Sequence, residues 1–562
     1  MSDSKVSQRH RPSWLHFNRW GLVFAAIFFT LGLTPSLLLR DWFYQGLVSG
    51  VSAGVGYGIG VLVHWLVVKF VVWRRISIPE SRWRIIDIAL ASILLIWMLA
   101  VIILSSRWQR GLAELTEGIP SPLWQRLLIL PTGLVVALLV VGVGRGARWV
   151  AQRIRRALPE RLAPTVRGAV GWVAVLLVAA WLVETAIPGS IVATGERIFS
   201  VRNANAEPGR DAPAETERAG SPTSSLSWDG VGAYGSRFLD QGLNAEELEE
   251  LSGEPAKEPI RLYAGIQHAP TDAQRAELII DELERTKATE REAILVTMTT
   301  GTGWVNSSTA QAFELLYNGD TAIAAEQYSS MPSAFHFFAG GEAVQTAGRE
   351  FITPILDWWN KLPEDDRPKL YLYGESLGTT AVESAFSGMR DIANSVDGIL
   401  LAGPPNFNPL WPEFTSRRDP GTPEVKPEYS AGMVVRFANN NQDIAALTQD
   451  EIEWGPTRML YLQHPSDPVV WWSPELIFTE PDWLKEDPGF DRLPEMGWAP
   501  FVTFLQLSAD LPVSQNVPDG HGHNYGNSMV PGFAAIAPDG RFDEAYVRET
   551  QDRLGEALVI GD

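Results

Sequence analysis

The chain has 562 residues, a formal net charge of −20 and no cysteine. The lack of cysteine excludes disulfides, a thiol nucleophile and a cysteine-ligated metal. Residues 1–199 hold 21 of the 46 basic and 9 of the 66 acidic residues, a net of +12, which leaves a net of −32 for residues 200–562. A basic, apolar first half and an acidic second half indicate a membrane domain joined to a soluble domain.

Five apolar segments in the first half approach or exceed the roughly 20 residues that cross a bilayer. A cleaved signal peptide does not account for them, because the first apolar core is too long and four more segments follow it. We therefore expect a helical transmembrane domain over residues 1–199. The five segments are Trp20–Leu39, Leu47–Val72, Ile85–Leu104, Leu127–Val143 and Val166–Ile187.

Basic residues in the short loops predict the orientation of this domain. They are concentrated in the N-terminus, in the second loop and in the fourth loop, which has seven arginines from Arg145 to Arg167. Because basic loops stay in the cytoplasm, five crossings would place everything after Ile187 outside the cytoplasmic membrane. Basic runs so close to membrane helices favour anionic lipid over nucleic acid as their neighbour.

A polar segment rich in Ala, Pro, Glu and Ser follows, from about Arg202 to Ser227. It has almost nothing to bury, so we expect an extracytoplasmic linker over residues 200–230. The remaining residues, 231–562, are numerous enough for one large domain with a full core.

Strand-like and helix-like stretches alternate in this second half. Such alternation predicts an α/β fold with a mostly parallel sheet covered by helices on both faces. The expected helices are Thr271–Lys287, Ser308–Tyr317, Glu342–Lys361 and Thr379–Met389. The expected strands are Arg261–Gly265, Ala293–Thr297, Thr321–Glu326, Leu370–Tyr373, Gly398–Ala402, Arg458–Gln463 and, least regular, Pro500–Leu507.

The pentapeptide Gly374-Glu375-Ser376-Leu377-Gly378 lies between an expected strand and an expected helix. A serine at such a sharp turn needs small residues two positions before and after it, because the backbone leaves no room for side chains. This context favours Ser376 as a nucleophile over a structural turn serine. Gly50-Val51-Ser52-Ala53-Gly54 has the same spacing, but it lies in an apolar segment where glycines every four residues indicate helix packing.

An acid and two histidines follow Ser376 in the chain. Asp467 comes just after the strand Arg458–Gln463, which favours it as the acid over Asp443 and Asp519. His521 and His523 each follow a glycine in Gly520–Tyr525, and either could be the base; we favour His523, which borders the next ordered segment. The order Ser, Asp, His is that of an α/β-hydrolase, in which the histidine accepts the serine proton and the carboxylate orients it.

The spacing His-x-His also suits a metal site, with His464 or Asp467 as a third ligand. No other residues have ligand spacing, so we expect neither a metal nor a cofactor. The glycine-rich turn Thr299–Gly303 follows the strand that should lie beside the nucleophile strand. We expect the backbone N–H of Thr302, with that of Leu377, to form an oxyanion hole, although an ordinary strand-ending loop would look similar.

Several motifs together resemble the actinobacterial membrane α/β-hydrolases that carry a multi-helix N-terminal domain. The resemblance covers nearly the whole chain except the linker, and it implies an α/β-hydrolase fold, serine-hydrolase chemistry and an envelope location, without indicating a substrate. It rests on Gly374–Gly378, Thr299–Trp304, Gly403–Trp411 (GPPNFNPLW), His464–Trp472 and Gly520–Tyr525.

These features predict a membrane-anchored esterase or lipase that acts on acyl esters, such as envelope lipids, through an acyl-enzyme on Ser376. Acyl transfer to a sugar or protein hydroxyl is the alternative within enzymes. A non-catalytic scaffold or sensor with a hydrolase fold is the alternative outside them, since a fold does not establish activity.

Overall fold

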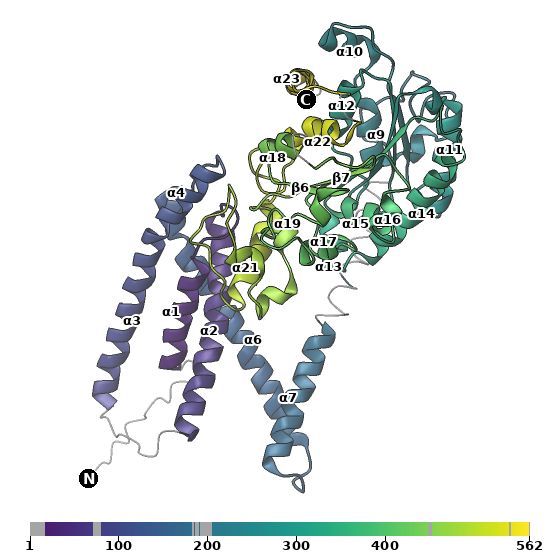
Figure 1. Ribbon diagram of the computed structural model, residues 1–562. Coiled ribbons are helices and arrows are strands. Elements are labelled where there is room, and N and C mark those ends of the chain that lie inside the picture. The colour runs from purple at the N-terminus through teal and green to yellow at the C-terminus, as the bar shows by residue number, and fades with distance from the viewer. Residues whose placement is uncertain are drawn as a thin grey trace, which may run out of the picture. The chain divides into compact units, whose positions relative to one another are not determined.

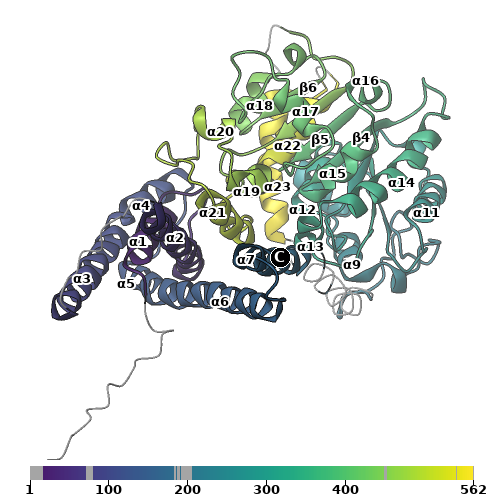
Figure 2. The same ribbon diagram turned by 90° about the horizontal axis from the view of Figure 1, so that it is seen from below.

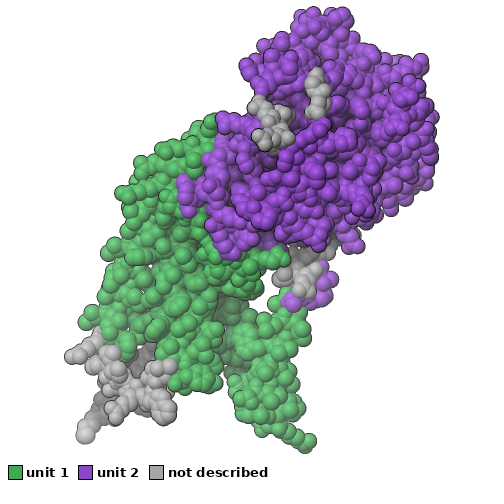
Figure 3. Space-filling model, viewed as in Figure 1, with its two compact units in different colours: residues 1–179, 475–480, 495–510 green, residues 180–474, 481–494, 511–562 purple. Residues whose placement is uncertain are grey.

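The computed structural model describes residues 17–70, 80–182, 205–447, 452–538 and 541–560, together with residues 185 and 190. The chain divides into two compact units (Figure 3). Unit 1 contains Met1–Ala179, Glu475–Glu480 and Glu495–Asp510, and unit 2 contains the rest. The basic residues of the N-terminus before position 17, and Arg74 and Arg75 of the second loop, lie outside the described residues.

Unit 1 is helical. Four helical stretches of the described chain are long and apolar enough to cross a membrane: Trp42–Phe70, Ile85–Leu115, Leu123–Ala157 and Pro164–Trp181. The first expected segment is shorter than predicted, because Pro35 cannot continue a helix and disfavours helical backbone at Thr34. The helices are α1 (Arg19–Gly32), α2 (Trp42–Phe70), α3 (Glu80–Leu104), α4 (Ser106–Leu115), α5 (Leu123–Leu127), α6 (Ile129–Ala157) and α7 (Pro164–Trp181).

The glycines of α2 allow close helix packing on two sides. A Cβ atom on Gly50 would lie 2.7 Å from the Gly133 carbonyl oxygen of α6, and one on Gly60 would lie 2.5 Å from the Trp20 carbonyl oxygen of α1. The helix-packing interpretation of this segment is therefore confirmed for these positions. It is wrong for Gly58, where an added Cβ would meet nothing within 4 Å.

A segment from the second half of the sequence completes unit 1. Helix α21 (Val502–Asp510) packs on the turn between α1 and α2, where the buried Asp510 carboxylate pairs with Arg40 at 2.8 Å. One turn earlier, Gln506 donates to the Thr34 carbonyl oxygen at 2.9 Å. Burial raises the pKa of Asp510 to about 6, although Arg40 and backbone N–H groups counteract part of the increase.

Unit 2 is built on a seven-stranded, entirely parallel sheet in the order β1-β3-β2-β4-β5-β7-β6. This confirms the expected fold class. Strand β4 is central, and β2 pairs with it as expected, with Met298 opposite Gly374. The strands are β1 (Ile260–Ala264), β2 (Ala293–Met298), β3 (Thr321–Glu326), β4 (Lys369–Glu375), β5 (Gly398–Ala402), β6 (Val435–Ala438) and β7 (Arg458–Leu462).

Helices cover both faces of the sheet (Figures 1 and 2). On one face α14 packs against both α11 and α15, and Gly348 of α14 meets the Ala381 backbone of α15. On the other face α12, α22 and α23 pack together, and Phe533 of α22 contacts Tyr373 of β4. These helices are α11 (Asp272–Arg285), α12 (Ser307–Leu316), α14 (Glu342–Trp359), α15 (Leu377–Ser384), α22 (Met529–Ile536) and α23 (Glu544–Ile560).

Two strand assignments differ from the sequence-based expectation. Pro500–Leu507 is not a strand: Val502, Gln506 and Ala509 are all buried, which is the spacing of one face of helix α21. Its β-branched and aromatic residues mimic a strand pattern. Strand β6 was not predicted, because it has only four residues and carries a charged Arg436, whose guanidinium is satisfied by carbonyl oxygens.

The segment expected to be a linker makes ordered contacts in its second half. Ala219 and Leu226 are fully buried, and the backbone of Arg218 forms an isolated parallel β-bridge with the backbone of Arg261 in β1. The buried Arg218 side chain also donates to three carbonyl oxygens and to Glu258. The composition gave no sign of this, because an arginine whose terminal N–H groups bind carbonyl and carboxylate oxygens can be buried despite its charge.

The glycine packing of α2 predicts different effects for two matched substitutions. Gly50→Leu should force α2 away from α6 and lower the thermal unfolding midpoint of the detergent-solubilised protein, since overpacking costs about 1–3 kcal/mol. Gly58→Leu should leave the midpoint nearly unchanged, because that position is open. Equal effects of the two changes in a thermal-shift measurement would contradict the α2–α6 contact.

Candidate active site

Ser376 lies in the sharp turn between β4 and α15 with φ 54° and ψ −125°, a conformation that non-glycine residues rarely adopt. The flanking glycines allow this turn. A Cβ atom on Gly374 would lie 2.5 Å from the Gly378 backbone, and one on Gly378 would lie 2.3 Å from the Met298 carbonyl oxygen at the end of β2. The turn leaves Ser376 just accessible, with 9% of its surface exposed.

The backbone N–H groups of the two expected oxyanion donors have no hydrogen-bond partner within the described chain. One belongs to Leu377, the first residue of α15, where helix geometry leaves the N–H free. The other belongs to Thr302, in the turn after β2, whose carbonyl oxygen accepts a bond from Gln327 at 3.1 Å. The hydroxyl of Tyr263 fixes the same turn by donating to the Gly303 carbonyl oxygen at 2.7 Å. Both N–H groups are thus unengaged in the described chain, and their role as oxyanion donors stays a prediction.

His523 and Asp467 form a buried pair. The Nδ1 atom of His523 lies 2.7 Å from Asp467 Oδ2, and both side chains are at most 3% exposed. Burial alone would lower the pKa of His523, but the Asp467 carboxylate outweighs this effect and raises the pKa above its ordinary value. The ring nitrogen Nε2 is buried and has no hydrogen-bond partner in the described structure, so it is available to accept a proton.

The carboxylate of Asp467 is held by more than the histidine. Its Oδ1 atom accepts the backbone N–H of Val469 at 2.8 Å, and its Oδ2 atom also accepts the Tyr525 hydroxyl at 2.8 Å. Tyr525 Oη in turn accepts the backbone N–H of His464 at 3.0 Å. These bonds leave the carboxylate one orientation, with Oδ2 directed at His523. The sequence reasoning missed Tyr525, although it lies two residues after His523 in the quoted motif.

His523 approaches the nucleophile turn across Gly403. The Ser376 N–H donates to the Ala402 carbonyl oxygen at 2.9 Å, and a Cβ atom on the next residue, Gly403, would lie 2.4 Å from the His523 ring. Only a glycine therefore fits between the turn and the ring. No hydrogen bond joins Ser376 Oγ to His523 Nε2 in these described residues, and such contacts often tighten only when substrate binds.

His521 faces a different carboxylate. Its Nδ1 atom lies 3.2 Å from Oδ2 of Asp491, a buried residue that the sequence reasoning did not consider. Asp491 also accepts the Ser466 hydroxyl, whose oxygen accepts the Gly522 N–H at 2.8 Å. The His521–Asp491 pair therefore fastens the histidine loop to the Ser466 turn. His464 binds the Gly522 carbonyl oxygen, so the three histidines do not converge on one point.

The alternatives to Asp467 lie elsewhere. Asp443 pairs with Lys426 at 2.9 Å, and Asp519 is exposed to solvent. The structure thus brings together Asp467 and His523, and it places His521, Asp443 and Asp519 in other contacts.

Glu383 explains the Gly403–Trp411 motif. This fully buried carboxylate of α15 accepts the backbone N–H groups of Leu410 and Trp411, at 2.6 and 3.0 Å, and the hydroxyl of Tyr461 at 2.9 Å. The Asn408 amide donates to it at 2.6 Å. Glu383 therefore connects the helix after Ser376 to the loop that carries Gly403. The sequence offered one signal, a single acidic residue in an otherwise uncharged helix.

Comparison with known proteins identifies the family of the chain. A model of the alpha/beta-hydrolase family matches residues 260–550, and a model of the N-terminus of that family matches residues 33–242. No curated protein and no solved structure matches the chain.

The two histidine–carboxylate pairs predict unequal effects of alanine substitution. His523→Ala should reduce hydrolysis of a chromogenic short-chain ester by roughly 10³-fold or more, because it removes the imidazole that Asp467 orients. His521→Ala should reduce it by less than about tenfold, since this ring positions the loop. A larger loss for His521→Ala, measured with both variants folded, would assign the base to His521.

Proposed function

We propose that this chain, which belongs to the alpha/beta-hydrolase family, is a serine hydrolase that cleaves acyl esters. The single observation that carries the proposal is the strained turn at Ser376, with the His523–Asp467 pair across Gly403 from it. A buried His–Asp pair with a free ring nitrogen is the arrangement that activates a serine hydroxyl. The roles of Ser376, His523 and Asp467 are part of this proposal.

In the proposed mechanism Ser376 Oγ attacks the acyl carbonyl carbon while His523 Nε2 takes the hydroxyl proton. The N–H groups of Leu377 and Thr302 stabilise the negative oxygen of the tetrahedral intermediate. His523 then returns the proton to the departing alcohol, which leaves an ester on Ser376. Water attacks that ester, its proton passes through His523 back to Ser376 Oγ, and the acid is released. Asp467 stays ionised and holds the imidazolium.

The substrate that we propose is an acyl ester of a membrane lipid. Helices of membrane-spanning length precede the catalytic unit in the same chain, and tethering raises the effective concentration at which an enzyme meets lipids. The proposed location is the cytoplasmic membrane, with the catalytic unit outside. This orientation depends on the basic N-terminus, second loop and fourth loop, the last of which precedes α7 in the chain.

Acyl transfer is the alternative to hydrolysis. It would use the same acyl-enzyme, with a sugar or protein hydroxyl attacking in place of water. A scaffold or sensor without catalysis is the remaining alternative, and it predicts a serine that is not activated.

Labelling with a fluorophosphonate tests the proposal, because this probe reacts only with activated serines. The wild-type protein should be labelled and the Ser376→Ala variant should not, while both remain in the membrane fraction. Ser52→Ala is the control, since Ser52 has the same sequence spacing but is buried within α2, and its labelling should equal that of the wild type. Labelling of Ser376→Ala at the wild-type level would exclude Ser376 as the nucleophile.

The absence of cysteine allows a direct test of the proposed orientation. We expect Glu364→Cys, at an exposed site after α14, to react with a membrane-impermeant maleimide on intact protoplasts. Glu160→Cys, exposed in the loop between α6 and α7, should react only after permeabilisation. The reverse pattern would place the catalytic unit in the cytoplasm.

A further inference from the structure

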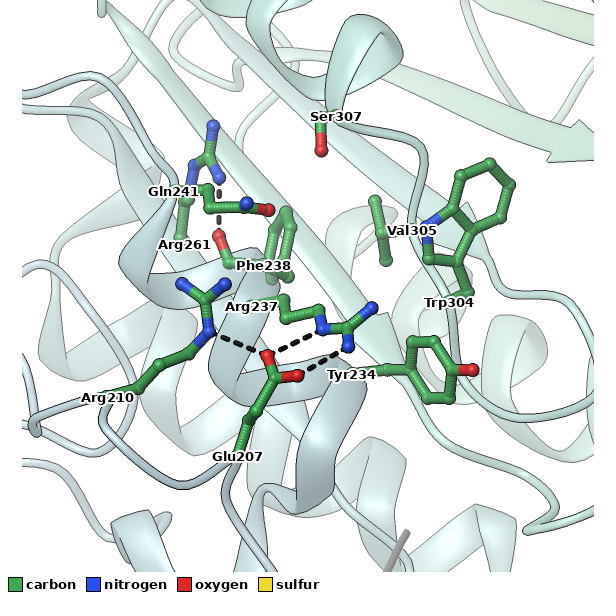
Figure 4. Close-up of a pocket in the computed structure, with 10 residues that line it drawn as sticks. All are labelled: Glu207, Arg210, Tyr234, Arg237, Phe238, Gln241, Arg261, Trp304, Val305 and Ser307. Carbon is green, nitrogen blue, oxygen red and sulfur yellow. Dashed lines mark hydrogen bonds and ion pairs between the residues drawn. The ribbon is translucent and has the colours of Figure 1, made fainter. Parts of the chain in front are cut away.

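A small polar cavity lies beside the turn that carries Thr302 (Figure 4). Its volume is about 190 Å³, below the roughly 300–1,000 Å³ of pockets for drug-sized ligands. It can therefore accommodate one ring-sized group but not a long acyl chain. Its walls are formed by helix α9 (Gly232–Asp240), the segment around Glu207, and Trp304, Val305 and Ser307 at the start of α12.

The cavity combines aromatic rings with free hydrogen-bonding groups. Figure 4 shows the half-buried rings of Tyr234 and Trp304 on the same side of the cavity. Within the described residues no hydrogen bond engages the Trp304 indole N–H or the hydroxyls of Tyr234 and Ser307. The side-chain amide of Gln241 is likewise unengaged and adds one more donor and one more acceptor.

The charges around the cavity are balanced. Glu207 accepts a hydrogen bond from Arg210 at 2.9 Å and two from Arg237, and these arginines lower the pKa of Glu207 to about 2, so it is ionised. Arg210 also pairs with Asp240, and Arg261 pairs with Glu314. Each of the three arginines thus has an acidic partner, and the cavity has no excess positive charge for an anion.

The cavity is connected to the proposed oxyanion donor by short, defined contacts. Trp304 follows the Thr302–Gly303 turn directly, and Tyr263 holds the Gly303 carbonyl oxygen. Asn306, at the other end of the cavity segment, donates to Glu375 Oε2 at 2.9 Å, and Glu375 precedes Ser376. A group bound in the cavity therefore contacts residues 304–307. This segment begins after the Thr302–Gly303 turn and contacts Glu375 of β4 through Asn306.

We propose that this cavity binds a neutral, hydroxyl-rich sugar ring, the alcohol part of the acyl ester, and this inference rests on the proposed function. An aromatic wall stacks on the apolar face of a sugar ring, and unengaged donors and acceptors bind its hydroxyls. The sugar is released with the His523 proton when the acyl-enzyme forms. In acyl transfer it would enter as the acceptor and lose a proton to His523 instead.

Direct binding tests the site apart from catalysis. The full-length Ser376→Ala protein in detergent is titrated with a panel of methyl glycosides, and binding is followed by saturation-transfer NMR and calorimetry. At least one glycoside should bind saturably, and Tyr234→Ala should weaken it by about tenfold or more. Tyr546→Ala, which removes a half-buried tyrosine of α23, is the matched control and should not.

Kinetics on the active protein give a second readout. Tyr234→Ala should raise KM for a sugar ester by a much larger factor than KM for a nitrophenyl ester with the same acyl group. Absence of saturable glycoside binding, or equal binding by Tyr234→Ala, would overturn the sugar site. Tighter binding of inorganic phosphate than of any glycoside would also overturn it, in favour of an anion site. The labelling result is a separate outcome. If the wild-type protein is not labelled by the fluorophosphonate, the proposal of Ser376 as the nucleophile fails, whereas glycoside binding can still be observed.

Discussion

The close approach between the β4–α15 turn and the end of β2 is the constraint on which the candidate site depends. A Cβ atom on Gly378 would lie only 2.3 Å from the Met298 carbonyl oxygen. The first turn of α15 therefore packs directly against the end of β2. This contact forces Ser376 into positive φ and frees the Leu377 N–H. It also brings the turn after β2, with Thr302, to the same edge of the sheet. The carboxyl ends of parallel strands are where such groups can gather.

Buried carboxylates hold the segments around this turn in place. Glu383 holds the Gly403–Trp411 loop to α15, Asp467 holds the His523 ring, and Asp491 holds the loop from which that ring projects. A buried carboxylate is costly unless its oxygens are satisfied, and removal of one partner from such a pair typically costs about 3–5 kcal/mol. Each of these groups therefore permits essentially one arrangement of the segments around it, which is what preorganised chemistry needs.

Unit 1 contains more than helices of membrane-spanning length. Its turn between α1 and α2 buries the Arg40–Asp510 pair, and Asp510 comes from a segment that follows the strands of the sheet in sequence. The intervening residues 481–494 return to unit 2 and include Asp491. Separation of the chain at the linker would therefore expose a buried ion pair as well as the apolar face of α21. Unit 1 is consequently completed by residues from both halves of the sequence.

The sequence by itself determined the features that depend on local chemistry. These are the positions of the apolar segments, the strand–turn–helix around Ser376 and the alternation that yields a parallel sheet, because periodicity and glycine positions act over a few residues. Only the tertiary structure decided which histidine faces Asp467, since His521 and His523 differ by two positions and their carboxylates lie 30 and 56 residues away. Strand β6 and helix α21 also required it, because their neighbours in space, and not their own residues, satisfy Arg436 and Asp510.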